Sequence, residues 1–307
     1  MRISVVIPVY NAEQSLPLVV ERLDKLRAGT DSIQEAVLVN DGSQDRSWQV
    51  IQELAAKHAW LRGINLMRNY GQHNALLSGI RAARHEVIVT MDDDLQNPPE
   101  EIPRLLARID EGYDVVYGAP LAEQHTLLRN IASTITKIAL QTMMGAETAR
   151  NVSSFRAFRT NLRDAFRDYR GPFVSIDVLL TWGSARFTAV KVKHAPRTIG
   201  VSHYTVRKLI VHALNMVTGF STLPLQVASI VGFVFALFGM GVLAFVVGRY
   251  LISGGSVPGF PFLASVIAIF SGAQLFALGI IGEYLARIHF RMMDRPSYTI
   301  AATTDKG

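Results

Sequence analysis

The sequence has no cysteine among its 307 residues. This absence excludes disulfide bonds and metal sites that depend on thiolate ligands. Basic residues outnumber acidic ones and give a formal net charge of +6, but they form no basic run and do not alternate with aromatic residues as in RNA-binding modules. We therefore expect no nucleic-acid partner, and we attribute the excess of basic residues to contacts with anionic lipids or phosphate ligands.

Two long stretches also lack charged side chains. No Asp, Glu, Lys or Arg occurs between Lys208 and Arg249, or between Arg249 and Glu283. Within these stretches, residues 225–248 and 262–282 are each long enough to cross a bilayer, because a spanning helix needs about 20 apolar residues. A core helix of a soluble protein rarely lacks a polar face over so many turns. The sequence therefore predicts two transmembrane helices joined by a short turn rich in Gly and Pro.

Basic residues flank this pair of apolar segments. Arg207 and Lys208 precede the first segment, and Arg287, Arg291 and Arg295 follow the second. Because positive charge is enriched on the cytoplasmic side of membrane proteins, we predict that both ends of the hairpin and both termini are cytoplasmic. The protein is then integral to a membrane, with the bacterial inner membrane as the expected location.

The N-terminal part alternates hydrophobic runs with amphipathic segments. We predict strands at residues 3–9, 36–40, 63–69 and 86–92 with helices between them, which indicates βαβ units, a parallel sheet and the α/β fold class. Ligands of such sheets bind beyond the carboxyl ends of the strands. Polar clusters follow all four strands, at residues 10–13, 41–43, 68–73 and 92–96. We therefore expect one site where these loops converge.

The whole chain divides into four predicted segments. Residues 124–145 have the spacing of an amphipathic helix, which could belong to the core or lie on the bilayer surface. We place a catalytic domain at 1–200, an amphipathic juxtamembrane helix at 201–223, the two transmembrane helices at 224–286 and a cytoplasmic C-terminal tail at 287–307. Three glycines of the first span, Gly239, Gly241 and Gly248, would permit close helix packing in a homo-oligomer.

Three consecutive acidic residues, Asp92, Asp93 and Asp94, stand at the end of the fourth predicted strand. Such a cluster must be solvated, protonated or neutralised by a cation. On an extended backbone Asp92 and Asp94 point to the same side, and with the amide oxygen of Gln96 they offer the hard ligands that suit Mg²⁺ or Mn²⁺. A cation there could bridge a diphosphate leaving group. The alternative is an acidic surface turn that caps a helix at residues 98–108.

Four ordered motifs carry a family resemblance: IPVYNAEQSL, VNDGSQDRS, RNYGQHNAL and MDDDLQNPPEEIP. Together they resemble the family 2 glycosyltransferases of GT-A fold, in particular the polyprenyl-phosphate glycosyltransferases. The segments HYTVRKLI, FSTLPLQ, GEYLARI and RPSYTI match the same group, so the resemblance covers nearly the whole chain. It implies an inverting enzyme that uses Mg²⁺ or Mn²⁺ to transfer a sugar from a nucleotide sugar, with UDP before GDP as the carrier, to undecaprenyl or dolichyl phosphate for cell-envelope glycan modification.

The resemblance also implies a nucleotide pocket. Its residues are Pro8, Tyr10, Asn11, Glu13, Asp41, Arg68, Asn69, Gly71, His73 and Asp92. Asp41 would meet the nucleobase, Asp92 would lie near the ribose and the metal, and Asp94 and Gln96 would be metal ligands. Local structural roles stay open, because Pro8 and Gly71 could only shape turns, Asn69 could cap a helix and Asp41 could form an Asx turn.

A lipid phosphate would be the nucleophile. A phosphate monoester has a second pKa of about 6 and is largely dianionic at neutral pH, so it needs positioning more than deprotonation. Relatives carry Asp or Ser at the position of Ser154, and we assign no catalytic base. Ser154 is expected to donate a hydrogen bond to a phosphate and Arg156 to compensate its charge, which makes them catalytic together with Asp92 and Asp94.

Four further basic residues are expected to hold the acceptor phosphate: Arg129, His203, Arg207 and Lys208. The sequence departs from the family here, since relatives commonly have Lys at the position of His203, and an Arg where this chain has Ala119 and Pro120. Ordinary anchoring of basic side chains beside a membrane is the alternative.

Two alternative functions would use the same nucleotide-binding part of the chain. A processive polysaccharide synthase needs a QxxRW-type segment and usually more spans, and neither is found in the sequence. A non-catalytic membrane protein that binds sugar nucleotides would keep the fold without turnover.

Overall fold

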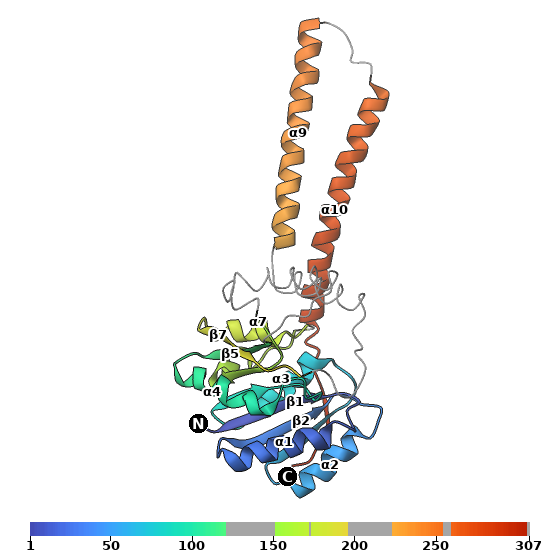
Figure 1. The fold of residues 1–307 in the computed structure, drawn as a ribbon. Coiled ribbons are helices and arrows are strands. Elements are labelled where there is room, and N and C mark those ends of the chain that lie inside the picture. Colours follow the sequence, from blue (N-terminus) through green and yellow to red (C-terminus); the bar gives the residue numbers. More distant parts are fainter. Residues whose placement is uncertain (121–150, 172, 196–222, 254–258, 306–307) are drawn as a thin grey trace. The chain divides into compact units, whose positions relative to one another are not determined.

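A computed structural model describes residues 1–120, 151–171, 173–195, 223–253 and 259–305 (Figure 1). The chain forms two compact units. The first comprises residues Met1–Ala213 together with Asp294–Gly307, and the second comprises Leu214–Met293. The first unit, which we call the sheet unit, contains a sheet of eight strands. The second contains two long apolar helices.

The sheet is mixed rather than wholly parallel. Its strands are β1 (Ile3–Val9), β2 (Ile33–Asn40), β3 (Leu61–Leu66), β4 (Val87–Thr90), β5 (Val115–Pro120), β6 (Arg156–Arg159), β7 (Phe187–Val192) and β8 (Ile300–Thr303), in the order β7-β5-β6-β4-β1-β2-β3-β8. The four predicted strands pair in parallel, which confirms the α/β class. The sheet as a whole is mixed, because the unpredicted strands β6 and β8 are antiparallel to their neighbours. A hydrophobic run looks the same in either direction, so its pattern does not reveal strand orientation.

Helices cover both faces of the sheet. They are α1 (Leu16–Gly29), α2 (Ser47–Lys57), α3 (Gln72–Ala82), α4 (Ile102–Asp110) and the short α7 (Ile176–Thr181). Figure 1 shows α1 and α2 on one face and α3 on the other. Side chains alternate along β1, so Val5 and Ile7 pack in the core cluster that contains α1, while Val6 faces α3. A Cβ on Gly79 of α3 would lie 2.4 Å from Val6, and this glycine therefore lets α3 approach the sheet closely.

The strand ends differ from the predicted ones at two places that matter for the site. β3 covers Leu61–Leu66 and leaves residues 67–71 as a loop. β4 ends at Thr90, so Asp92 to Gln96 lie in a turn. The prediction that Asp92 and Asp94 point to the same side assumed an extended strand, which the structure does not have at these residues. Leu95 has a φ of 59°, which extended backbone excludes. A turn of 3₁₀ helix, Pro99–Glu101, then leads into α4, where the sequence predicted one helix over 98–108.

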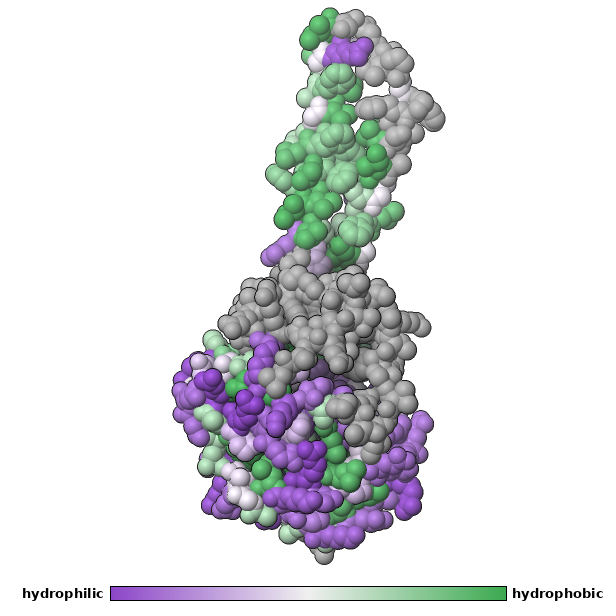
Figure 2. Space-filling view, viewed as in Figure 1, coloured by the Kyte–Doolittle hydropathy of each residue, from purple (hydrophilic) through white to green (hydrophobic). Residues whose placement is uncertain are grey.

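The second unit consists of α9 (Leu223–Ser253) and α10 (Phe260–Met292). Residues Pro224–Ile252 and Ile269–Met292 are long and apolar enough to cross a membrane, and no residue of their most apolar windows is buried. Figure 2 shows hydrophobic side chains covering these helices. The helices pack on each other, with a Cβ on Gly239 only 3.0 Å from the Phe270 ring. Gly239 thus serves packing inside the hairpin.

The C-terminal residues do not form the separate tail predicted at 287–307. Residues up to Met292 continue α10, and Asp294–Gly307 belong to the sheet unit. β8 adds to the edge of the sheet beside β3. The missed strand is short and exposed, so it lacks the hydrophobic pattern by which strands are recognised.

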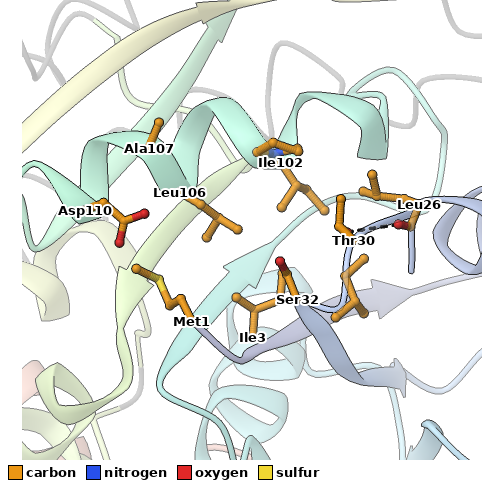
Figure 3. Close-up of a pocket in the computed structure, with 11 residues that line it drawn as sticks. Met1, Ile3, Leu26, Thr30, Ser32, Ile102, Leu106, Ala107 and Asp110 are labelled. Carbon is orange, nitrogen blue, oxygen red and sulfur yellow. Dashed lines mark hydrogen bonds between the residues drawn. The ribbon is translucent and has the colours of Figure 1, made fainter. Parts of the chain in front are cut away.

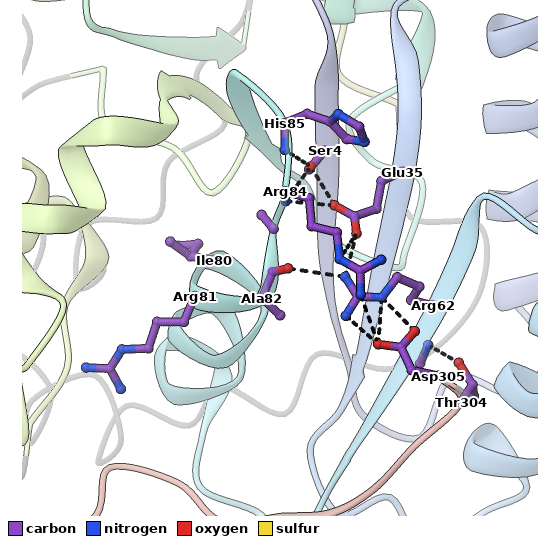
Figure 4. A network of polar contacts seen from close by, with 12 residues as sticks. Ser4, Glu35, Arg62, Ile80, Arg81, Ala82, Arg84, His85, Thr304 and Asp305 are labelled. Carbon is purple, nitrogen blue, oxygen red and sulfur yellow. Dashed lines mark hydrogen bonds and ion pairs between the residues drawn. The ribbon is translucent and has the colours of Figure 1, made fainter. Parts of the chain in front are cut away.

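A polar network fixes this C-terminal strand to the sheet (Figure 4). Buried Glu35 of β2 accepts hydrogen bonds from Ser4 Oγ at 2.7 Å and from Arg62 Nη1 at 2.5 Å. The Arg62 guanidinium also binds Asp305 through Nη2 at 2.6 Å and Nε at 2.8 Å. Arg84 contributes its backbone N–H to Glu35 at 3.0 Å. One guanidinium therefore joins a buried carboxylate to the end of the chain.

Candidate active site

The loops after β1 and β2 are joined by reciprocal hydrogen bonds. Asn11 has a φ of 53°, and its Oδ1 accepts from the backbone N–H of Gln44 at 2.8 Å. Glu13 Oε2 accepts from the N–H of Arg46 at 3.0 Å, while the Glu13 N–H donates to Asp45 at 3.1 Å. Asn11 and Glu13, both predicted for the nucleotide pocket, therefore fix the loop that carries Asp41.

Asp41 holds the next loop. Its buried carboxylate accepts hydrogen bonds from the backbone N–H groups of Tyr70 at 2.7 Å and Gly71 at 2.8 Å. Burial raises the pKa of Asp41, and these two bonds oppose the rise. Gly42 has a φ of 64°, and a Cβ there would lie 2.4 Å from the backbone of Arg68 and Asn69. Asp41 is thus more than an isolated Asx turn, since it connects the loops after β2 and β3.

The loop after β3 places other predicted residues beside the acidic turn. Gly71, with a φ of 93°, is the residue that precedes α3, so Asn69 does not cap that helix. The side chain of the next residue, Gln72, donates to Asp92 Oδ1 at 2.7 Å. His73 Nδ1 accepts from the backbone N–H of Ile176 at 3.4 Å, which ties α3 to the start of α7.

Two predicted residues of this region are more accessible. Tyr10 is 41% exposed at the end of β1, and its backbone N–H points to Asp93 at 3.4 Å. Exposed Arg68 lies over the ring of Tyr70, with 4.7 Å between the guanidinium carbon and the ring centroid. Pro8, in contrast, is buried within β1 and is paired in register with Val39 of β2. Tyr10 and Arg68 are therefore accessible to a ligand, whereas the side chain of Pro8 is enclosed within the sheet.

Ser154 connects the acidic turn to a distant part of the chain. Ser154 Oγ donates to Asp92 Oδ2 at 2.5 Å. Asp94 Oδ1 accepts from the N–H of Gln96 at 3.1 Å, which closes a local turn. The structure thus brings the predicted residues Ser154 and Asp92 together, with the Ser154 hydroxyl donating to Asp92.

Asp93 is half-buried and has a carboxylate on each side of it in the chain. Burial, followed by the charges of Asp92 and Asp94, raises the pKa of Asp93 to about 7. No group of three or more His, Cys, Asp or Glu with metal-binding geometry occurs among the described residues. The oxygen donors of Asp92 and Asp94 nonetheless suit a hard divalent cation that takes its other ligands from water and substrate. A cation would also relieve the repulsion at this turn.

Arg156 has a different position from the one expected of a phosphate ligand. It is only 2% exposed, and its Nη1 donates to the buried carboxylate of Asp177. Its Nε donates to Thr90 Oγ1 at 3.1 Å, and Thr90 in turn donates to the carbonyl oxygen of Ser154 at 2.6 Å. Tyr117 adds a hydrogen bond to Asp177 at 3.0 Å. The Arg156 charge is therefore neutralised inside the protein, and the residue reaches the site through Thr90 and Ser154.

Sequence reasoning missed several of these residues. Gln72 and Asp45 lie inside the quoted motifs, so their polar character next to predicted residues was an available signal. Thr90 and Asp177 gave no such signal, because both meet Arg156 of β6, which lies 66 positions from Thr90 and 21 positions from Asp177 along the chain. The predicted acceptor residues Arg129, His203, Arg207 and Lys208 lie outside the described residues.

Comparison with protein families gives a match over residues 4–170 to the family described as "Glycosyl transferase family 2". This range contains the four converging loops. The chain belongs to glycosyl transferase family 2.

Relatives of this glycosyltransferase extend the similarity over nearly the whole chain. It is 36% identical over 306 residues to the undecaprenyl-phosphate 4-deoxy-4-formamido-L-arabinose transferase of Pectobacterium carotovorum subsp. carotovorum (strain PC1), covering 98% of this chain and 93% of the relative. It is 39% identical to the protein of the same name from Shewanella sediminis (strain HAW-EB3), covering 97% and 91%. The alignments therefore include the apolar helices as well as the sheet unit.

Solved structures support the GT-A fold of this glycosyltransferase. Mannosyl-3-phosphoglycerate synthase from Rubrobacter xylanophilus matches with a TM-score of 0.53 at 17% identity, covering 70% of this chain and 72% of that chain. Glucosyl-3-phosphoglycerate synthase from Mycobacterium tuberculosis, solved with Mn²⁺, UDP and glucosyl-3-phosphoglycerate, also has a TM-score of 0.53 at 17% identity, covering 71% and 77%.

A cavity of about 270 Å³ in this glycosyltransferase lies away from the loops just described (Figure 3). It is lined by residues at the amino ends of β1 and β2, including Met1, Ile3 and Ser32, and by Leu106 and Asp110 of α4. Parallel sheets of this kind bind substrates at the opposite, carboxyl ends. None of the predicted site residues lines the cavity.

Proposed function

We propose that this protein transfers a sugar from a UDP-linked donor to a polyprenyl phosphate, and that it is anchored in the membrane where that lipid lies. The observation that carries the proposal is the similarity of 36–39% identity to undecaprenyl-phosphate sugar transferases over 97–98% of the chain. The 4-deoxy-4-formamido-L-arabinose named for those relatives is the first sugar to test. Undecaprenyl phosphate is the first acceptor.

The donor nucleotide would lie across the loops after β1, β2 and β3. Asn11, Glu13 and Asp41 would hold these loops in place, since their side chains make the bonds between them. Tyr10 and Arg68 would contact the nucleotide directly, because both are exposed at the carboxyl ends of the strands.

A divalent cation, Mg²⁺ or Mn²⁺, would be held by Asp92 and Asp94 with Gln96. After burial, the charges of Asp92 and Asp94 raise the pKa of Asp93, and a cation held by Asp92 and Asp94 would relieve this repulsion. The Mn²⁺ and UDP in the solved glucosyl-3-phosphoglycerate synthase from Mycobacterium tuberculosis support a divalent cation in general. When bound, the cation would stabilise the negative charge that develops on the diphosphate leaving group.

The protein's own residues would mainly align the reactants. A phosphate oxygen of the lipid attacks the anomeric carbon in line, the bond from that carbon to the nucleoside diphosphate breaks, and the configuration inverts. A dianionic phosphate needs no general base. Ser154 orients the Asp92 carboxylate through its hydrogen bond of 2.5 Å, and Arg156 acts through Thr90 to position Ser154. Arg129, His203, Arg207 and Lys208 would compensate the charge of the acceptor.

The apolar helices α9 and α10 would span the membrane with both termini in the cytoplasm. Their lengths and exposed apolar surfaces suit a bilayer, and Arg287, Arg291 and Arg295 follow the positive-inside rule. Confinement to the membrane would keep the enzyme in the plane of its acceptor.

The proposal is tested by incubating the purified full-length protein with Mn²⁺, undecaprenyl phosphate and radiolabelled UDP-sugars. We expect labelled product in the organic phase. A labelled polymer would indicate a processive synthase, and nucleotide binding without product would indicate a non-catalytic protein, so either result contradicts the proposal.

The cation assignment is tested by Asp94→Ala. We expect at least a 100-fold loss of lipid-sugar formation with intact membrane insertion, because metal assistance contributes several kcal/mol to such reactions. The matched control is Asp110→Ala, an exposed carboxylate on α4 at the other end of the strands. Turnover retained by Asp94→Ala would refute the assignment.

A further inference from the structure

The segment directly after β7, residues 193–195, has no part in the mechanism proposed above, yet it contacts the acidic turn. β7 is an edge strand of the sheet and ends at Val192, whose side chain is fully buried in the core. Beyond it, the backbone N–H of Ala195 donates to the carbonyl oxygen of Gln96 at 2.8 Å. The segment therefore bonds to one of the residues proposed to hold the cation.

His194 adds a side-chain contact to the same turn. Its Nδ1 lies 3.4 Å from Oδ1 of Asn97, and an Nδ1 that carries its proton donates to that oxygen. His194 is exposed, whereas Asn97 is buried. Residues 193–195 thus contact two consecutive residues of the turn, one through the backbone and one through a side chain.

The turn that receives these contacts has an unfavourable backbone conformation. Leu95 lies between Asp94 and Gln96, the two proposed metal ligands, and has a φ of 59°. This left-handed region is unfavourable for a residue with a Cβ, and such a conformation persists only where neighbouring contacts enforce it. The contacts around Leu95 therefore decide how the two ligands are directed.

Three contacts around Leu95 come from different parts of the sheet unit. The Leu95 side chain is buried in the hydrophobic core. The Gln96 N–H donates to Asp94 Oδ1 at 3.1 Å within the turn, and the Gln96 carbonyl accepts from Ala195 beyond β7. The peptide groups on both sides of Gln96 are thus bonded. A metal site needs ligands that are held by such supporting contacts.

We infer that residues 193–195 are a positioning segment for the cation site, in which Ala195 and His194 hold the turn Asp94–Asn97 in the conformation that binds a divalent cation. This inference rests on the proposed function. The segment acts through the turn and does not itself touch the cation. The simpler role of these residues is to end β7 against the turn, and that role predicts a change in stability without a specific effect on cation binding.

The first test compares His194→Ala with His194→Asn in the full-length protein. Ala removes the contact with Asn97, whereas the amide nitrogen of Asn is a donor close to the position of Nδ1. We expect His194→Ala to weaken Mn²⁺ binding in the presence of UDP by roughly twofold to tenfold, the range of one hydrogen bond, as measured by titration calorimetry. UDP binding in EDTA should not change. His194→Asn and the neighbouring exposed control, Lys193→Ala, should bind Mn²⁺ as the wild type does.

The second test concerns the backbone bond. Ala195→Pro removes the N–H that donates to Gln96, whereas Ala195→Gly keeps it. We expect Ala195→Pro to lose at least as much Mn²⁺ affinity as His194→Ala, and Ala195→Gly to stay close to wild type.

Wild-type Mn²⁺ affinity in both His194→Ala and Ala195→Pro would overturn the inference, even if their thermal stability falls. An equal loss of affinity in Lys193→Ala would overturn it as well. If the wild type itself binds neither Mn²⁺ nor UDP and transfers no sugar, the proposed function fails instead.

Discussion

Thr90 is a small buried residue that connects two charged groups of the site. Its hydroxyl accepts from Arg156 and donates to the Ser154 carbonyl, and Ser154 in turn binds Asp92. A buried ion pair such as Arg156–Asp177 contributes little net stability. The role of this ion pair is geometric. It fixes Arg156, which binds Thr90, and Thr90 in turn binds Ser154 beside the acidic turn.

Thr90→Val has nearly the same shape but removes both hydrogen bonds, and we expect roughly tenfold weaker activation by Mn²⁺ because Ser154 loses its support. Titration of Mn²⁺ binding by electron paramagnetic resonance provides a measurement besides activity. Thr90→Ser keeps the hydroxyl and serves as the control. Identical Mn²⁺ affinities for the Val and Ser variants would show that Thr90 only packs.

The Arg62 guanidinium links the residues after β8 to a buried carboxylate of β2. Arg62 is the shared partner of Glu35, which is buried, and Asp305, which is partly exposed. Removing one partner of a buried pair leaves an uncompensated charge, and this costs more than the pair contributes.

We therefore predict that Arg62→Met lowers the free energy of unfolding by roughly 3–5 kcal/mol, measured by denaturant in mild detergent. The double variant Glu35→Gln/Arg62→Met should recover much of the loss because the buried charge is gone. Arg108→Met removes an exposed pair with Glu111 and should leave stability unchanged. A loss for Arg62→Met no greater than for Arg108→Met would contradict the prediction.

The apolar helices allow a prediction of their own. Leu237 lies near the middle of α9 and is 48% exposed. If α9 spans the bilayer, Leu237→Arg should reduce insertion by roughly 2.5–3.5 kcal/mol, the cost of an arginine at a helix centre. The measurement is the fraction of protein that resists extraction by alkaline carbonate. Leu237→Phe is the control, and equal resistance of both variants would argue against a span.

For the whole molecule, the absence of cysteine makes topology directly measurable. We introduce Gln52→Cys on α2 and, separately, Ser256→Cys between the apolar helices. With both termini cytoplasmic, an impermeant maleimide should label Ser256→Cys in intact spheroplasts and Gln52→Cys only after lysis. The cysteine-free parent protein, treated with the same maleimide, gives the level of non-specific labelling. The reverse pattern would overturn the proposed orientation.

The described parts of the molecule show how far sequence reasoning reaches. The α/β class, the bounds of β1, the two apolar helices and the convergence of the loops after β1, β2, β3 and β4 follow from periodicity, composition and motifs. The antiparallel strands β6 and β8 and the burial of Arg156 do not. Their partners lie far away in the chain, and a hydrophobic or charged residue carries no mark of the partner that it will meet.

The sequence alone determined which chemistry is available: oxygen ligands without thiolates, four polar loops at strand ends, and apolar segments of membrane-spanning length. These depend on residue type and on local spacing, which the chain carries in itself. Only the tertiary structure decided that Arg156 is neutralised by Asp177 and that the residues after α10 return to the edge of β3. Both depend on contacts between distant segments, because burial and pairing are properties of the packed chain and not of any one stretch.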